Sequence, residues 1–484
     1  AMIHTLFDQQ LVAADELLGF APDLLSVEKY VVDYPPKRVA KLIGMSETQI
    51  IGLVASFCGA GSAVCYGRMG ASVQAFGTLT QYLIMLFNML TGNLDRQGGM
   101  MFTQPAADFL PHSGRGSIAN FHSRVRNLPA FAGEFPVSAL AEEINTQGEG
   151  QIKAMVIGAG NPILTTPNGQ QLDKAFENLD FVVAVDFYIT ETSRHANIIL
   201  PPVTSLERDH YDIVFHNFAV RNSSKFSPAI FPPAKTSKTS KTDWQIYLGL
   251  AERLDKLNGL PTDRYQTLWQ KEPKGVVDDL LKSGRYRHES EELSIDLLLK
   301  NPHGIDLGPL QPDLPEAIYH NDKQIHLSFD YFMADLSRLD KHFFATEQVN
   351  DGSLQLIGRR HLKTNNSWLH NSQRMVKGTN SGLSRCTAQI HPSDAHKHNI
   401  QDQQMISVTS RVGQVSLPAE ITEKIMPGVI SIPHGWGHNK KGSQWQTAEQ
   451  HAGVSVNDLT DEMVLDELSG NAVLNGVPVT IAAA

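Results

Sequence analysis

Cysteine, positive charge and long apolar runs are all scarce in this chain of 484 residues. Its three cysteines (Cys58, Cys65 and Cys386) cannot form a disulfide framework, and no two of them make a CxxC pair. Acidic residues outnumber basic ones by 51 to 41, and the net charge of −10 argues against a broad surface for nucleic acid or anionic membranes. The longest apolar run, 82–90, is far shorter than the ~20 residues of a membrane-spanning helix. Length and composition predict instead a globular protein of two or three domains.

The chain also lacks the marks of a signal peptide, since residues 1–18 have no basic stretch and hold acidic side chains. Residues 2–7 already have the spacing of a helix, with no capping residue before them. We therefore expect the C-terminal portion of a longer protein. The localisation stays unknown: a cytoplasmic location is slightly favoured, but a twin-arginine signal could lie upstream.

Most of the information lies in residues 153–202. Two apolar runs, each followed by a loop, flank a stretch of helical spacing, and the second run ends on Asp186. In chain order they are the first apolar run at 154–157, its loop (a GAGNP turn) at 158–162, the helical stretch at 168–178 and the second apolar run at 181–185. A β-α-β unit of this kind presents its loops at the carboxyl edge of a parallel sheet, where α/β proteins bind their ligands. A third short strand is expected at 196–202.

Three features near this edge allow two interpretations each. The GAGNP turn lacks the GxGxxG spacing of a dinucleotide fingerprint, so it is either an ordinary βα turn or a ligand loop. Asp186 either accepts hydrogen bonds from a guanine or ribose edge or caps a helix at 190–195. Arg208 either binds phosphate bidentately or belongs to a solvated, ion-paired turn.

The rest of the chain changes character once, from helices mixed with turns to short strands that predict a small β-barrel. Gly44 is expected to end a helix, and Ser46 with Gln49 to form the capping box of the next one. The expected elements are helices within 2–57 and at 76–90 and 243–254, a strand at 63–67, irregular or linker segments at 100–150 and 223–242, and barrel strands at 404–410, 413–419, 428–432 and 477–481.

The histidine-rich stretches predict no metal site, because their spacing matches no standard zinc pattern. The side chains considered were Cys386, His391, His396 and His398. The loop 434–438 either lines a pocket or closes a barrel hairpin. Basic residues within 112–126 either attract an anionic substrate or form a solvated loop; they are His112, Arg115, His122, Arg124 and Arg126. We predict no catalytic residue and no metal ligand in this chain.

Taken together, these segments resemble the molybdopterin oxidoreductase family, the group of dimethyl-sulfoxide reductases, nitrate reductases and formate dehydrogenases. The resemblance is carried by the helix that ends in Thr91-Gly92-Asn93, by the GAGNP turn and by the VDFYITETSRHANIILPP block at 185–202. Further similar stretches lie at 356–360, 366–370, 390–395, 427–428, 435–436 and 456–460. The matches follow the family's order over nearly the whole chain.

This resemblance implies a fold of the α/β class. A Rossmann-like parallel-sheet domain, incomplete on its N-terminal side, would occupy 1–345, and a double-psi-type β-barrel that binds the molybdopterin dinucleotide would occupy 346–484. The implied cofactor is bis(molybdopterin guanine dinucleotide) with molybdenum or tungsten. An iron–sulfur cluster would belong to the preceding region.

The resemblance also carries over cofactor-binding residues in three groups. One guanosine diphosphate arm would lie near Gly160, Asn161, Asp186, Arg208 and Asp243. The pterin would be approached by Met69 and Gly70. The barrel would supply Gly358, Arg359, Asn366 and Asn457. One departure is that Asn475 and Gly476 stand where family barrels often carry a basic residue.

We therefore expect the C-terminal half of an oxidoreductase that carries out two-electron chemistry, with a formate dehydrogenase-like activity slightly favoured. A small-molecule substrate and an electron-transfer partner subunit or domain are implied, without nucleic acid and without a membrane segment in this chain. The 484 residues alone are predicted to be inactive, because the metal ligand and the electron outlet would lie elsewhere. The alternatives are a metal-free structural subunit of an electron-transfer complex that keeps the fold, and a plain nucleotide-binding module.

Overall fold

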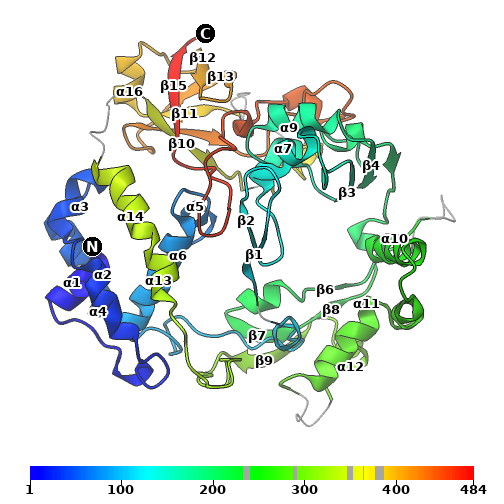
Figure 1. Ribbon diagram of the computed structural model, residues 1–484, viewed down its shortest axis with the longest axis horizontal. Helices are drawn as coiled ribbons and strands as arrows, with labels where there is room; N and C mark the ends of the chain where they lie inside the picture. Colours follow the sequence, from blue (N-terminus) through cyan, green and yellow to red (C-terminus); the bar gives the residue numbers. More distant parts are fainter. Residues whose placement is uncertain (115, 233–239, 287–291, 346–352, 363–364, 377–385) are drawn as a thin grey trace. The chain divides into compact units, whose positions relative to one another are not determined.

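The computed structural model describes residues 1–114, 116–232, 240–286, 292–345, 353–362, 365–376 and 386–484 (Figure 1). They form two compact units, and each unit uses distant parts of the sequence. Unit 1 comprises Ala1–Tyr66, Tyr82–Arg115 and Pro202–Ala334, and unit 2 comprises Gly67–Gln81, Gly116–Pro201 and Asp335–Ala484. The expected domain boundary at 345–346 adjoins 346–352, outside the described residues, and stays a prediction.

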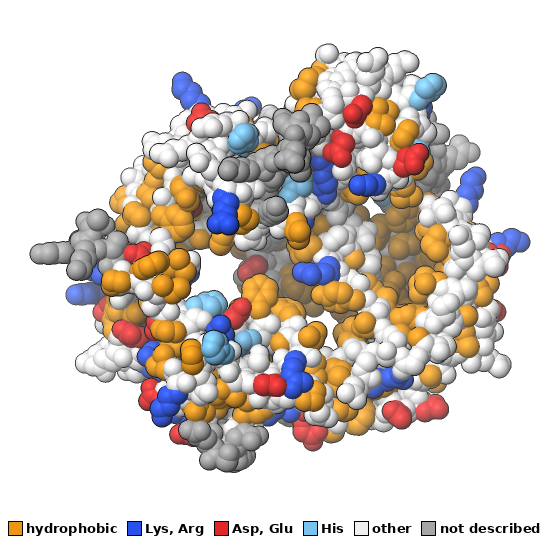
Figure 2. Space-filling model, turned by 180° about the vertical axis from the view of Figure 1, so that it is seen from behind, with side chains coloured by type: hydrophobic (Ala, Val, Ile, Leu, Met, Phe, Trp, Pro, Cys, Tyr) orange, Lys and Arg blue, Asp and Glu red, His pale blue; other side chains and the backbone are white. Residues whose placement is uncertain are grey.

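Charge is mixed over the described surface. Figure 2 shows lysines and arginines interspersed with aspartates and glutamates over the visible face. This distribution agrees with the modest negative net charge of the sequence. None of the helices in the described part of the chain has the length and apolar character needed to span a bilayer.

Unit 1 is built mainly of helices, and two of their ends follow local signals. α3 (Pro36–Ile43) ends at Gly44, whose φ of +69° lies in the left-handed region that glycine adopts without steric cost. α4 (Glu47–Cys58) begins with a reciprocal capping box, in which Ser46 accepts from the Gln49 N–H and Gln49 accepts from the Ser46 N–H. Both predicted signals are confirmed. The other helices of this unit are α1 (Met2–Asp8), α2 (Glu28–Val31), α10 (Asp243–Leu257), α11 (Asp263–Ser283), α12 (Ile295–Lys300) and α13 (Phe329–Met333).

The long apolar helix is confirmed as α6 (Gly77–Leu90), but the strand expected at 63–67 is wrong. The side chain of Asn88, on α6, accepts from the Cys65 N–H at 2.8 Å and donates to the Cys65 carbonyl at 2.8 Å. One amide side chain thus provides both hydrogen bonds that a neighbouring strand would have supplied.

The segment 223–242 was expected to be a linker, and this expectation is wrong in part. β7 (Arg221–Ser224) pairs antiparallel with β9 (Ile305–Pro309), and β8 (Phe226–Ser227) pairs antiparallel with β6 (His210–Tyr211). Residues 233–239 lie outside the described residues. The helix expected from residue 243 is α10, and its N-cap is Thr242.

In unit 2 the predicted β-α-β unit is confirmed. β3 (Ala154–Gly158), β4 (Phe181–Val185) and β5 (Ile198–Ile199) form a parallel sheet in the order β3-β4-β5. α7 (Leu140–Asn145) and α9 (Gly169–Phe176) pack on one face over a shared apolar cluster: Ala141, Ile144, Ile157, Leu172, Ala175, Phe176 and Val182. On the opposite face Val156 and Ile198 are 53% and 45% exposed. The finer Rossmann-like assignment stays a prediction.

The expectation of an irregular segment at 100–150 is also wrong in part. β1 (Ile118–His122) and β2 (Pro129–Phe131) form an antiparallel hairpin, and α7 follows them. Arg115, one of the basic residues singled out in this segment, lies outside the described residues.

The expected β-barrel is confirmed and is closed. Its six strands run in the order β10-β14-β11-β13-β12-β15, and Figure 1 draws them from yellow to red. They are β10 (Leu354–Arg359), β11 (Ala388–Ile390), β12 (Met405–Thr409), β13 (Gln414–Ile421), β14 (Val429–Pro433) and β15 (Val477–Ala483). Alternate side chains fill the interior, as the period of two in each strand requires; they include Leu356, Ala388, Ile406, Leu417, Ile430 and Ile481.

Short helices complete unit 2. They are α5 (Met69–Ser72), α8 (Pro162–Thr165), α14 (Asp335–Asp340), α15 (Gln373–Val376) and α16 (Pro392–Lys397).

Candidate functional site

Asp186 lies at the carboxyl end of β4, where a parallel sheet presents ligand-binding loops. Its Oδ1 accepts a hydrogen bond from the Tyr188 N–H at 3.1 Å, which orients the carboxylate within the loop. The short helix expected at 190–195 begins only at Ser193, so Asp186 does not cap it. Burial raises the pKa of the Asp186 carboxyl, although the backbone N–H groups of Tyr188 and Phe187 oppose the rise. The geometry therefore leaves the ligand-binding interpretation of Asp186 in place.

Asn161, the residue after Gly160 in the GAGNP turn, has its side chain bonded within the protein. Its Nδ2 donates to Glu191 Oε2 at 2.7 Å, and its Oδ1 accepts from the Thr192 hydroxyl at 2.7 Å. Ala159, earlier in the turn, adopts φ +49°. The turn is thus held to the loop after β4 by side-chain contacts, and a ligand would meet its backbone rather than the Asn161 amide.

Glu191 is the centre of a buried polar cluster that the sequence did not reveal. Its Oε1 accepts from the Trp445 indole N–H at 2.9 Å and lies 3.2 Å from Nδ1 of His438. His438 Nε2 lies 2.8 Å from Nδ1 of His370, and the side chains of Glu191 and His438 have no exposure. The loop 434–438, which was expected either to line a pocket or to close a hairpin, ends in this cluster.

The cluster keeps Glu191 ionised. Burial of the carboxyl acts to raise its pKa, but the hydrogen bond and charge of His438, together with the amide of Asn161, outweigh burial and lower the pKa. A buried carboxylate with this many donors is a rigid support rather than a ligand group, because each of its oxygens already has a protein partner.

Two predicted residues of the barrel are also bonded within the protein. The guanidinium of Arg359 donates to the carbonyls of Ser431 and Thr387 at 2.5 and 2.8 Å and lies 3.9 Å from Glu420. Asn457, on the short helix Val456–Asp458, is 1% exposed and donates to the Leu164 carbonyl at 2.7 Å. Their roles at the cofactor stay predictions, and the structure shows them as supports.

Asn475 connects two of the predicted glycines. Its Oδ1 accepts from the Gly358 N–H at 2.9 Å, and its Nδ2 donates to the Gly70 carbonyl at 3.4 Å. This residue stands where the family resemblance led us to expect a basic side chain, and here it forms a neutral bridge. Met69, beside Gly70 on α5, is 57% exposed.

Asn366 provides the test of whether a pterin dinucleotide fits these residues. Its Oδ1 is buried and has no hydrogen-bond partner among the described residues, an arrangement that costs free energy unless a ligand or water supplies a donor. Gly435 packs against the Asn366 backbone so closely that a Cβ would lie 2.7 Å from its carbonyl carbon. Pterin and guanine rings carry N–H donors that match this acceptor and the Asp186 carboxylate, so the residues fit the group.

In unit 1, Arg208 and Asp243 contact each other; their expected place near one guanosine diphosphate arm stays a prediction. The guanidinium of Arg208 donates to Asp243 Oδ2 at 3.1 Å, with 42% and 32% of the two side chains exposed. The two interpretations of Arg208 are both compatible with this contact, since an exposed ion pair exchanges easily for a phosphate.

Two of the basic residues within 112–126 are paired with glutamates. Arg126 Nε lies 2.6 Å from Glu142 Oε1, and Arg124 Nε lies 3.3 Å from Glu143 Oε2. This pairing favours the structural interpretation of the segment over the attraction of an anionic substrate.

Comparison with known proteins gives the family. The family model described as molybdopterin oxidoreductase matches residues 2–253, and the model described as molydopterin dinucleotide binding domain matches residues 354–478.

Curated relatives include the F420-dependent formate dehydrogenase subunit alpha of Methanocaldococcus jannaschii, 25% identical over 90% of this chain and 62% of the relative. Formate dehydrogenase H of Escherichia coli is 24% identical over 90% of this chain and 60% of its own. Trimethylamine-N-oxide reductase of Haemophilus influenzae is 23% identical over 89% of this chain and 57% of its own. The chain thus spans about three fifths of the length of these relatives.

Among solved structures, acetylene hydratase from Pelobacter acetylenicus superposes with a TM-score of 0.71 at 15% identity, over 100% of this chain and 69% of that one. This likeness concerns the fold. The family models, which match residues 2–253 and 354–478, carry the assignment. The chain belongs to the molybdopterin oxidoreductase family and includes its molybdopterin dinucleotide-binding domain.

Proposed function

We propose that this chain binds bis(molybdopterin guanine dinucleotide) with molybdenum or tungsten, as part of an oxidoreductase of which formate is the favoured substrate. The observation that carries the proposal is the Asp186 carboxylate at the carboxyl end of β4, oriented by the Tyr188 N–H. Support for formate comes from relatives named as formate dehydrogenases in three organisms.

In this account the chain's own residues bind and orient the cofactor. Asp186 accepts hydrogen bonds from the guanine edge, and Asn366 accepts one through its buried Oδ1. Arg208 neutralises phosphate charge after exchanging its contact with Asp243. The Glu191 cluster fixes the GAGNP turn through Asn161, which keeps the backbone of that turn in place. When bound, the cofactor supplies two-electron redox chemistry.

The finer architecture belongs to the same proposal. The sheet β3-β4-β5 would be part of a Rossmann-like domain, and the closed barrel would be of the double-psi type. We further propose that an electron-transfer partner subunit or domain is needed, and that the 484 residues alone are inactive. The support is that the chain spans about three fifths of the length of relatives such as the F420-dependent formate dehydrogenase subunit alpha. An iron–sulfur cluster would lie in further polypeptide, and a cytoplasmic location stays slightly favoured.

Nucleotide binding to two matched variants tests the role of Asp186. Asp180 precedes the same strand at its opposite end and is exposed, so Asp180→Asn removes an equal charge from the sheet without touching the ligand edge. Calorimetric titration with GDP and with ADP should show a preference for GDP in the wild type and in Asp180→Asn. Asp186→Asn should lose about 10- to 100-fold in GDP affinity, the value of a hydrogen bond to a charged group. Equal GDP affinity in the two variants would refute the assignment.

A metal-free structural subunit is the second candidate, and one observation favours it. The side chains of Asn161, Arg359 and Asn457 are all bonded to protein groups, as a scaffold without cofactor requires. Metal analysis together with the fluorescence of released pterin separates the two candidates. A protein that contains neither molybdenum, tungsten nor pterin would support the structural subunit.

A further inference from the structure

A group of potential metal ligands lies in unit 1, and it includes none of the residues assigned above to the cofactor. His320, Asp322 and His326 each offer one ligand atom, and these atoms lie within 4.8 Å of one another. Among the described residues, this is the one group of three or more His, Cys, Asp or Glu side chains whose ligand atoms lie this close together. Their sequence pattern, H-x-D-x3-H, matches no standard zinc motif.

The loop that carries these side chains is fixed by backbone contacts. The Lys323 N–H donates to the His320 carbonyl at 3.0 Å, which closes a turn. The Ile325 N–H donates to the Phe20 carbonyl at 2.7 Å, and the Gln324 side chain donates to the Gly19 carbonyl at 3.2 Å. One stretch of unit 1 that is remote in sequence, residues 19–20, therefore holds the loop in one conformation, which lowers the entropy lost when a ligand orders it.

Hydrogen bonds behind the three side chains orient them as outer-shell partners orient metal ligands. His320 Nδ1 lies 3.2 Å from the Gln324 carbonyl, and a proton donated there leaves the lone pair on Nε2. Asp322 Oδ1 accepts from the Gln324 N–H at 3.0 Å, so Oδ2 remains for a ligand.

The spacing of two ligand atoms matches a shared metal ion. Asp322 Oδ2 lies 2.9 Å from His326 Nε2. Two atoms that each sit about 2.1 Å from one metal ion are about 3.0 Å apart at a right angle and about 3.4 Å apart at the tetrahedral angle. The largest separation in the group, up to 4.8 Å, closes by rotation of an exposed side chain. The rings of His320 and His326 already lie with centroids 4.8 Å apart.

We propose that His320, Asp322 and His326 bind one divalent first-row transition-metal ion of the zinc class. Two imidazoles and one carboxylate suit Zn²⁺, Co²⁺ and Ni²⁺, and water completes the coordination. The lysine of the loop does not compete for the carboxylate, because Lys323 Nζ donates to the Ile318 carbonyl at 2.7 Å.

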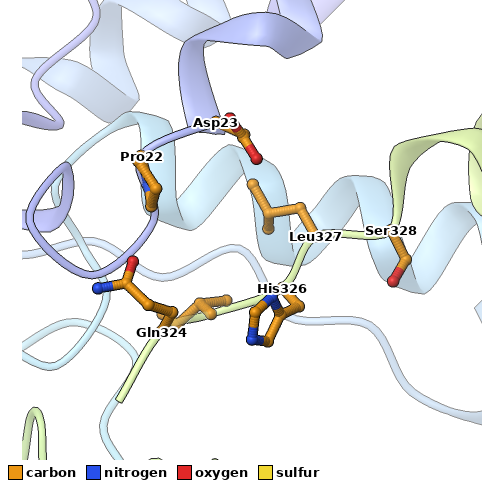
Figure 3. A pocket seen from close by; sticks show the side chains of 7 residues that line it. Pro22, Asp23, Gln324, His326, Leu327 and Ser328 are labelled. Carbon is orange, nitrogen blue, oxygen red and sulfur yellow. The ribbon is translucent and has the colours of Figure 1, made fainter. Parts of the chain in front are cut away.

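Space for the water ligands lies beside His326. This residue lines a cavity of about 360 Å³ together with Pro22, Asp23, Gln324 and Leu327, as Figure 3 shows. Since the cavity joins the loop to the 19–23 stretch, a bound ion strengthens a contact that the Phe20 and Gly19 carbonyls already make. The proposed metal site uses none of the residues assigned to the cofactor, so it does not depend on the function proposed above.

Titration with Co²⁺ tests the proposal, because protein-bound Co²⁺ absorbs visible light in a way that reports its ligands. The full chain is first dialysed against a chelator and then titrated with Co²⁺ alone. One equivalent should bind with a new visible absorption, and Zn²⁺ should displace it. His320→Ala and His326→Ala should each weaken binding at least 10-fold. His303, another exposed histidine of the same unit, provides the matched control, and His303→Ala should bind as the wild type does.

Asp322→Asn guards against a variant that merely unfolds the loop. The asparagine keeps an acceptor for the Gln324 N–H and so preserves the turn, but its neutral oxygen is a poorer ligand. It should also weaken Co²⁺ binding, while the melting temperature of the chelator-treated protein stays within a few degrees of the wild type. Absence of a stoichiometric site, or full binding by His326→Ala, would show that the three side chains form only a hydrogen-bonded turn.

Discussion

Nδ1 of His438 lies 3.2 Å from Oε1 of Glu191, and both side chains are completely buried. The two residues are 247 positions apart in the sequence, so the contact ties the loop after β4 to the loop after β14 within unit 2. Trp445 and Asn161 donate to the same carboxylate at 2.9 and 2.7 Å. Glu191 thus joins three separate segments of unit 2 through buried hydrogen bonds.

Glu191→Ala should destabilise the protein by about 3–5 kcal/mol, because it leaves the buried donors of His438, Trp445 and Asn161 without an acceptor. The measurement is the free energy of unfolding in urea. Glu177→Ala removes an exposed glutamate at the end of α9 and should change stability by less than about 0.5 kcal/mol. A Glu191→Ala protein as stable as Glu177→Ala would contradict the role given to the cluster.

Acid should weaken this cluster in a defined direction. The folded-state pKa of Glu191 is lowered, so its contribution to stability is present above the ordinary glutamate value of about 4.3 and is lost as the pH falls through the lower, folded-state pKa. The stability difference between wild type and Glu191→Gln should therefore shrink below about pH 4. Urea midpoints of both proteins, measured from pH 7 to pH 3, check this expectation. A stability difference that grows towards low pH would mean that the pKa of Glu191 is raised in the folded state rather than lowered.

Asp186 should show the opposite linkage. Burial raises its folded-state pKa, so the ionised carboxylate reduces stability once the pH exceeds the ordinary aspartate value of about 3.9. Asp186→Asn, which keeps an acceptor for the Tyr188 N–H, should melt at a higher temperature than the wild type at pH 7. The gain should disappear as the pH is lowered and the wild-type carboxyl becomes protonated. If Asp186→Asn raises the melting temperature and also weakens GDP binding, the carboxylate serves ligand binding at the expense of stability. A lower melting temperature for Asp186→Asn would indicate a structural role instead.

Asn475→Ala should free the backbone at Gly358. The substitution removes the acceptor that holds the Gly358 N–H at 2.9 Å, and one hydrogen bond of this kind contributes about 0.5–1.5 kcal/mol. Hydrogen exchange at the Gly358 amide should become several-fold faster, whereas the Ile430 amide in the neighbouring strand β14 should exchange as before. Unchanged exchange at Gly358 would mean that the strand pairing alone protects it.

Much of the fold was predictable because its signals are local. The Gly44 helix end and the Ser46–Gln49 capping box are decided within a few residues, and the four C-terminal barrel strands show alternation along each strand. The strand expected at 63–67 failed for a non-local reason, since Asn88, 23 residues away from Cys65, took both backbone bonds.

The cofactor-binding positions carried over by the resemblance stay predictions, and their contacts within the protein could not be predicted. The ion pair between Arg208 and Asp243 is one such contact. Glu191 could not be found, because its partners His438 and Trp445 lie 247 and 254 residues away, and a buried carboxylate has no local pattern. For the same reason the sequence could not show that Asn457 is bonded to the Leu164 carbonyl, 293 residues away.

The most direct test of the account is chemical analysis of the full-length protein for metal, pterin and nucleotide. We expect molybdenum or tungsten together with the fluorescence of oxidised pterin, and release of GMP on acid hydrolysis at about two equivalents per metal. Purified protein that contains neither metal nor pterin, or that releases no guanine nucleotide, would contradict the claim that this chain holds a molybdopterin guanine dinucleotide cofactor.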